Sequence, residues 1–197
     1  GAVLVAVVLL LLLGSVRSAL ISLIAIPLSL LTAVAVLERL GITINTITLG
    51  GLAIALGEVV DDSIIDVENI FRRLRELWAR TAATAISPDP GPVVLQASLE
   101  VRRAVVYATF VVALVFVPVL AMTGLQGSFF RPLAVSYILA IMASLVVALT
   151  VTPALSYLLF GRGVRKTEEP LVQRFLKAIY RRVLGFVMRW PRAIILM

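Results

Sequence analysis

The sequence contains no cysteine and no histidine among its 197 residues. Without cysteine, the chain has no disulfide framework and no thiolate metal site. Without histidine, it lacks the commonest metal ligand and the usual proton carrier near neutral pH. Any proton chemistry in this chain must therefore use carboxylates, with lysine, arginine or tyrosine beside them.

Charged residues are also scarce, at 15% of the chain, while 61% is hydrophobic and the mean hydropathy is +1.08. Soluble domains are about 45–50% apolar, so this composition predicts a protein that lies in a lipid bilayer. The net charge of +7 is typical of basic loops that face the cytoplasm and anionic lipid. We expect no nucleic-acid partner.

Long apolar segments alternate with short polar turns, and a helix needs about 20 apolar residues to cross the hydrocarbon core. These segments are too long and too uniformly apolar for the strands of a membrane barrel. We therefore predict an all-α, polytopic transmembrane helix bundle. The expected parts are three transmembrane helices in 1–70, a cytoplasmic loop at 71–102, two transmembrane helices in 103–160, a cytoplasmic loop with an interfacial helix at 161–189, and the start of a further transmembrane helix at 190–197.

Local signals refine these bounds. Asn45 is a plausible N-cap for the segment 45–70, and Gly41 suits a left-handed position after the preceding helix. Gly124, Gly127 and Pro132 are expected to form a turn. The chain begins and ends inside apolar runs, so we expect it to be a piece of a longer protein.

The basic residues predict the orientation and one interfacial helix. If the first turn faces the cytoplasm, 16 of the 18 Lys and Arg residues lie on that side, and only Arg39 and Arg131 face outward. Residues 171–187 place apolar side chains at helical spacing and arginines and lysines on the remaining face. This pattern predicts a cytoplasmic amphipathic helix in the membrane interface.

The segment 45–70 is unusual because it carries five carboxylates. At 100° per residue, Glu58, Asp62 and Asp66 lie on one stripe of the helix, and Asp61 and Glu68 lie on an adjacent one. An aspartate near the bilayer centre costs about 2.5–3.5 kcal/mol on insertion scales. Such a residue must be paired, protonated or hydrated.

We predict that Asp61 and Asp62 exchange protons, since two adjacent carboxylates repel one another and favour protonation. Asp66 and Glu68 lie near the cytoplasmic end and are expected to be solvated, with an accessory polar role as the alternative for each. The role of Glu58 stays open, either as an accessory polar group or as an interhelical hydrogen-bond partner. The other spanning segments hold no Lys or Arg at mid-membrane depth. The counter-charge for the pair is therefore expected to be water, a proton or a residue outside this chain.

Residues 57–69, Gly-Glu-Val-Val-Asp-Asp-Ser-Ile-Ile-Asp-Val-Glu-Asn, resemble the fourth transmembrane helix of resistance–nodulation–division (RND) efflux permeases, with its pattern Gly-x-x-Val-Asp-Asp-Ala-Ile-x-x-Val-Glu-Asn. Further stretches resemble the same family in order, including 16–27, 41–46, 116–118, 127–133 and 149–155. The resemblance places the chain at transmembrane helices two to six and the start of helix seven.

The resemblance implies a multi-pass permease of the bacterial inner membrane that exports small molecules or metal ions by proton antiport. It implies no cofactor, since the proton-motive force drives transport. It also implies a homotrimer that works with a periplasmic adaptor and an outer-membrane channel. Asp61 and Asp62 match the proton-relay pair of the family. The relay Lys and Arg would come from helices in the remaining half of the permease, which agrees with the missing counter-charge.

The substrate branch stays open. Heavy-metal exporters resemble Asp-Phe-Gly-x-x-x-Asp-Gly-Ala-x-x-x-Val-Glu-Asn, but here Ala55 takes the first Asp position and Asp62-Ser63 replaces Gly-Ala. A protein-translocation or lipid-transport component of the same superfamily is the main alternative. An acidic cation channel is less favoured. So is an intramembrane aspartyl protease, because both Asp lie on one helix. We expect a secondary active transporter and not an enzyme, and no resident metal site.

Overall fold

The computed structural model describes residues 2–81, 89–160, 179–182 and 184–185, and it is helical with no strand over these residues. The all-α prediction is therefore confirmed for the described chain. The main helices are α1 (Ala2–Leu13), α2 (Val16–Arg39), α3 (Thr46–Thr81), α4 (Gly91–Val115), α5 (Val117–Leu120) and α6 (Gly124–Phe160).

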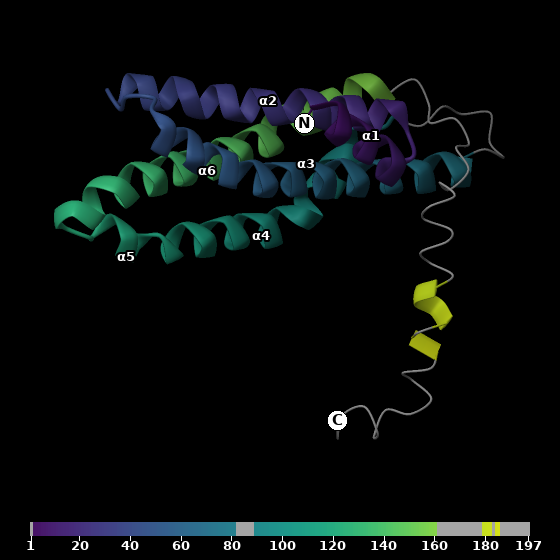
Figure 1. Cartoon of the computed structure of the whole chain (residues 1–197). Helices are drawn as coiled ribbons and strands as arrows, with labels where there is room; N and C mark the ends of the chain where they lie inside the picture. Colours follow the sequence, from purple (N-terminus) through teal and green to yellow (C-terminus); the bar gives the residue numbers. More distant parts are fainter. Residues whose placement is uncertain (1, 82–88, 161–178, 183, 186–197) are drawn as a thin grey trace.

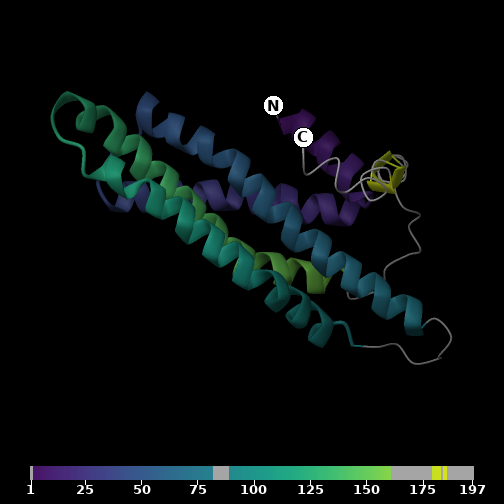
Figure 2. The same cartoon turned by 90° about the horizontal axis from the view of Figure 1, so that it is seen from below.

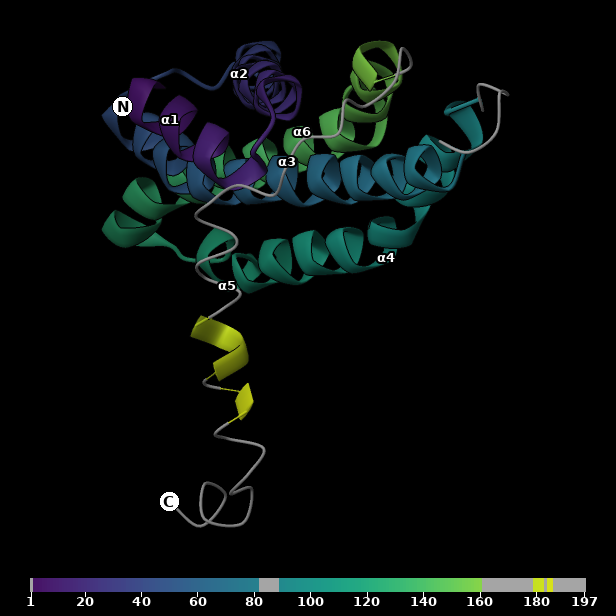
Figure 3. The ribbon, with the colours of Figure 1, turned by 90° about the vertical axis from the view of Figure 1, so that its right-hand side faces the viewer.

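The helices form three layers, with α3 and α6 side by side in the middle (Figure 1). Helix α2 covers one side of this pair and contacts both of its members, while α4 covers the opposite side and does not touch α2 (Figure 3). Helix α1 packs against α2 at the outside of the bundle. Helix α3 therefore has neighbours on part of its circumference where it carries the carboxylates, and its far end projects beyond them (Figure 2).

Helices α3 and α6 run in the same direction. At the start of α3, the backbone at Gly51 approaches the side chain of Ser136 and the carbonyl of Leu133 so closely that a methyl group there would collide with both. Near the other end of α6, the ring of Phe71 lies 5.4 Å from the ring of Phe160. The two helices therefore stay in contact over most of the length of α6, and small residues permit the closest approach.

Both expected helix signals are confirmed. The Asn45 side chain accepts hydrogen bonds from the backbone N–H groups of Ile47 and Thr48, both at 2.9 Å, and the Thr48 hydroxyl accepts one from the Asn45 N–H at 2.8 Å. This reciprocal cap satisfies donors that the first turn of α3 leaves free. Gly41 has φ +68° and follows the last residues of α2, as a left-handed C-terminal glycine does.

The segment 71–102, expected as a loop, is mostly helical where it is described, because α3 continues to Thr81 and α4 already begins at Gly91. The extension is held by apolar burial: Ile70 and Leu74 of α3 pack with Val94 and Ala97 of α4. The side of the membrane on which it lies stays a prediction.

The turn expected at 124–132 is also shorter than predicted. Gly124, with φ +71°, begins α6, whereas Gly127 and Pro132 lie inside that helix. Position 127 requires glycine, because a Cβ atom there would collide with the carbonyl of Met122. The break between α4 and α5 falls at Phe116, before Pro118.

Three stretches of the described chain are long and apolar enough to cross a membrane: Val16–Arg39, Gly91–Leu120 and Gly124–Phe160. Helix α3 is not among them, because its most apolar part already contains Glu58, Asp61 and Asp62. That α3 spans the bilayer stays a prediction. The expected interfacial helix at 171–187 and the helix start at 190–197 lie largely or wholly outside the described residues.

Candidate functional site

The carboxylates of α3 divide into buried and exposed groups. Asp62 and Asp66 are buried, with 8% and 6% of their surface exposed. Glu58, one turn before Asp62, is half-buried, whereas Asp61 and Glu68 are exposed. A single stripe of the helix thus turns Glu58, Asp62 and Asp66 inward, as the sequence predicts from their spacing.

The packing of α3 explains why this stripe is buried. Ala55, two turns before Asp62 on the same face, belongs to the apolar cluster that α3 forms with Tyr137 and Ala140 of α6. On the neighbouring face, Ser63 approaches α2, where the hydroxyl of Ser22 donates to its carbonyl oxygen at 3.4 Å. The acids therefore enter the bundle because small and apolar residues around them bring α2 and α6 close.

Asp62 has no partner for part of its carboxylate. Its Oδ2 atom is buried and makes no hydrogen bond to any residue that the structure describes. The phenol of Tyr137 lies near enough to interact electrostatically with both Glu58 and Asp62, and its ring stacks on Phe116 at a centroid distance of 4.5 Å. An ionised carboxylate left without a partner in an apolar interior is costly. The group is therefore suited to binding a proton or a mobile cation.

The structure separates the two adjacent acids that the sequence pairs. Asp62 points into the contact of α3 with its described neighbours, whereas Asp61 is exposed on the surface of this part of the protein. Within the described residues, neither of them forms an ion pair. That their counter-charge is water, a proton or a residue outside this chain stays a prediction.

One expectation was wrong: Asp66 is buried and not solvated. The expectation depended on a helix that ends at residue 70 and on a loop at 71–102. In the structure α4 returns alongside this level of α3, and the Asn69 amide donates to the carbonyl of Ala97 at 2.7 Å. Glu68, on the other stripe, is exposed as expected.

Arg102 is a functional candidate that the sequence analysis missed. Its Nη2 donates to the carbonyl of Leu149 in α6 at 3.4 Å, and its Nε is buried without a hydrogen-bond partner among the described residues. The guanidinium lies close enough to Asp66 for an electrostatic interaction between them. Helical periodicity could have found it, because Arg102 continues the buried stripe of α4 that contains Val94, Ser98, Val105 and Thr109.

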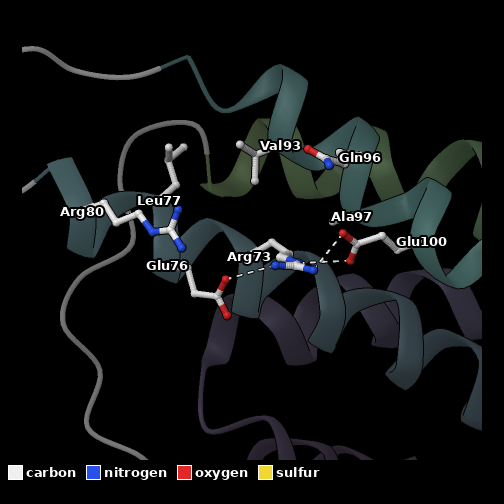
Figure 4. A pocket seen from close by; sticks show the side chains of 8 residues that line it. All are labelled: Arg73, Glu76, Leu77, Arg80, Val93, Gln96, Ala97 and Glu100. Carbon is white, nitrogen blue, oxygen red and sulfur yellow. Dashed lines mark hydrogen bonds and ion pairs between the residues drawn. The ribbon is translucent and has the colours of Figure 1, made fainter.

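A second charged region lies where the ends of α3 and α4 pair, beside a cavity of about 220 Å³. Arg73 donates through Nε and Nη2 to the two carboxylate oxygens of Glu100, at 3.1 and 2.8 Å, and through Nη1 to Glu76 at 3.3 Å (Figure 4). The hydrogen bonds with Glu100 raise the pKa of the Arg73 guanidinium above its usual value, and the charge of Glu100 adds to this. These ion pairs of Arg73 tie the two helices together.

No group of three Asp or Glu side chains among the described residues converges as a metal site would. The acids of α3 lie along the helix, one turn apart, instead of around a common point. What the stripe can do chemically is to take up and release protons inside a helix bundle.

The family model described as AcrB/AcrD/AcrF family matches residues 1–197, the full length of the sequence. The chain belongs to the AcrB/AcrD/AcrF family. This family lies in the RND superfamily of efflux permeases, so the resemblance seen in residues 57–69 is confirmed. Together with the three apolar helices, membership in the AcrB/AcrD/AcrF family identifies a membrane protein.

Individual relatives agree with this assignment. The chain is 37% identical over 201 residues to the swarming motility protein SwrC of Bacillus subtilis (strain 168). The alignment covers 99% of this chain and 18% of SwrC. It is 36% identical over 197 residues to the cation efflux system protein CusA of Escherichia coli (strain K12), covering 98% and 19%. It is 32% identical over 172 residues to the cobalt-zinc-cadmium resistance protein CzcA of Cupriavidus metallidurans, covering 87% and 16%. The chain thus spans less than a fifth of each of these AcrB/AcrD/AcrF-type relatives.

Proposed function

We propose that this chain is the proton-translocating transmembrane part of an RND-type efflux permease that exports small molecules or metal ions by proton antiport. One observation carries the proposal: the carboxylate of Asp62 is buried, and its Oδ2 atom has no hydrogen-bond partner among the described residues. Asp62 lies on α3, which packs against helices that are apolar enough to cross a membrane. Family membership supplies the transport context. The names of two relatives, which mention cation efflux and cobalt, zinc and cadmium resistance, favour metal ions within this proposal.

The physical logic is that protonation changes the charge of a group that the bundle has removed from water. When Asp62 carries a proton it is neutral, and its burial costs little. When it loses the proton, the charge must be matched by a cation or by water, and helices rearrange to provide them. Asp61, on the exposed side of α3, would meet the relay Lys and Arg helices of the remaining half of the permease.

In this proposal the protein is a secondary active transporter and not an enzyme, and it uses the proton-motive force without a cofactor. It would lie in the bacterial inner membrane as a multi-pass homotrimer, joined to a periplasmic adaptor and an outer-membrane channel. The family resemblance and the apolar helices support these assignments.

The test uses the full-length permease in inside-out membrane vesicles with an acidified interior. Addition of Zn²⁺ or of ethidium, as metal and organic-cation probes, should dissipate the proton gradient reported by a pH-sensitive dye. Asp61→Asn and Asp62→Asn should each abolish this response, because neither amide can carry the proton. Glu76→Gln is the matched control, since Glu76 is an acid of the same helix that lies beyond the predicted spanning segment 45–70 and is paired with Arg72 and Arg73. An undiminished response in both Asp variants would contradict the relay.

A further inference from the structure

Asp66 is a buried acid for which the proposed relay has no use. It lies one turn beyond Asp62 on the same stripe of α3, and only 6% of its surface is exposed. In the family pattern for this helix, its position is one of the unspecified ones. Side chains four residues apart on a helix are neighbours, about 5–6 Å between Cβ atoms. A proton on Asp62 therefore has a second carboxylate within reach, directly or through one water.

Arg102 enters the same level of the bundle from α4. It donates to the backbone of α6 at Leu149 and interacts electrostatically with Asp66 on α3, so it lies where the three helices meet. Its buried Nε has no partner among the residues that the structure describes. An arginine that only closed a structural ion pair would be expected to bind its carboxylate through two hydrogen bonds. The structure shows no ion pair between Arg102 and Asp66.

The polar surroundings at this level extend into α6. Thr152 and Ser156 follow Leu149 along that helix, are fully buried, and have hydroxyl oxygens without a hydrogen-bond partner among the described residues. Buried polar groups are nearly always satisfied by protein or by water. These two hydroxyls therefore form a buried polar strip of α6, next to apolar residues such as Leu155, within two turns of the Arg102 contact at Leu149.

Few other charges influence Asp66. Asp62, on its own helix, and Arg102, on α4, are the charges that act on Asp66, whereas Glu58 and Asp61 act on Asp62. Glu68 lies two residues further along α3, on its exposed stripe. From α2, Arg17 extends to the carbonyl of Leu159 in α6. The buried part of α6 carries no ionised side chain after Arg131. The charge state of Asp66 should therefore respond mainly to Asp62 and Arg102.

We propose that Asp66 is a second proton-binding carboxylate on the cytoplasmic side of Asp62, and that Arg102 is the positioning residue that fixes its charge. The proton leaves the carboxylic acid of Asp62 and joins the carboxylate of Asp66, so that Asp62 becomes ionised and Asp66 neutral. Asp66 then releases the proton to water, and Arg102 stabilises the carboxylate that is left. This inference rests on the proposed function, since it extends the same proton path.

The experiment measures Zn²⁺- and ethidium-induced proton flux of the full-length permease in the same vesicles, as a function of pH. Asp66→Asn should lower the flux severalfold. Arg102→Gln should move the pH of half-maximal flux upward by roughly one unit, because removing a nearby cation disfavours the carboxylate. In the double variant, Arg102→Gln should cause no further shift, because its target is gone. Arg103→Gln, at the exposed neighbouring position, is the matched control.

Conservative variants keep the result interpretable if a variant folds poorly. Arg102→Lys retains a cation and Asp66→Glu retains a carboxylate, so both should keep a pH profile closer to that of the wild type than Arg102→Gln does. Wild-type profiles in Asp66→Asn and Arg102→Gln, alongside an inactive Asp62→Asn, would overturn the accessory pair and leave the relay intact. Full activity in both Asp61→Asn and Asp62→Asn would instead refute the proposed function itself.

Discussion

The middle of α3 and its last turns both carry charged residues, but the surroundings of these residues differ. In the middle, Glu58, Asp62 and Asp66 line a buried stripe with no ion pair among the described residues. In its last turns, Arg73 binds Glu100 and Glu76 at 2.8–3.3 Å at an exposed helix pair. Matched charges in water hold a structure in place, whereas unmatched charges in a bundle favour a change of protonation. The difference indicates where function lies along one continuous helix.

The largest effect is expected from breaking the close packing that buries the stripe. Gly51→Ala should lower the free energy of unfolding by about 1–3 kcal/mol, because the added methyl group meets the backbone of Leu133 and the side chain of Ser136. Gly50→Ala is the matched control, since a methyl group there meets nothing within 4 Å. It should be neutral or stabilising by up to about 1 kcal/mol, because alanine favours a helix. Denaturant unfolding of the purified permease in detergent measures both. Equal losses in the two variants would show that the described contact of α3 with α6 does not hold the bundle.

A smaller effect sharpens the contrast between acids of the same helix. This chain has no cysteine, so in a permease whose other segments are also free of cysteine, single cysteines placed at residues 66 and 68 can be labelled selectively. Glu68→Cys should react quickly with a water-soluble maleimide, whereas Asp66→Cys should react slowly, because Asp66 is only 6% exposed. Denatured samples of both variants provide the reference rate. Equal labelling rates in the native permease would place Asp66 in water, as the sequence pattern predicts.

The smallest effect is expected at the paired end of α3. Arg73→Gln and Glu100→Gln each remove one side of an exposed ion pair, so each should reduce stability slightly, and the reduction should shrink as salt is added. The double variant should lose no more than either single variant, since the interaction is shared. Proton flux should be unchanged in all three. A loss of coupled proton flux with intact folding would show that residues of α3 beyond residue 70 also take part in transport.

Much of the fold could be predicted from the sequence because it depends on local signals. Apolar runs, the Asn45 cap and the Gly41 turn are read directly from neighbouring residues, and the structure confirms them. The failures come from long-range packing. Residues 71–81 and 91–102 are polar enough to suggest a loop, yet they form helices because Leu74 and Val94 are buried against each other.

The site was predicted only in part for the same reason. Helical spacing places Glu58, Asp62 and Asp66 on one stripe, but it does not show that α4 packs beside the last part of that stripe, so the sequence predicts a solvated Asp66. Arg102 was missed because its approach to Asp66 depends on how α4 returns past α3, which joins residues far apart in the chain. The proton-relay roles of Asp61 and Asp62 stay predictions.

The acidic character of α3 has a consequence for biogenesis. On the scale of about 2.5–3.5 kcal/mol for an aspartate at mid-helix, a segment with Glu58, Asp61 and Asp62 within five residues partitions poorly into lipid on its own. Only residues 40–45 separate α3 from the strongly apolar α2. We expect α2 and α3 to enter the membrane together as a helical hairpin. Helix α2 would then shield the acids from lipid until α4 and α6 are inserted.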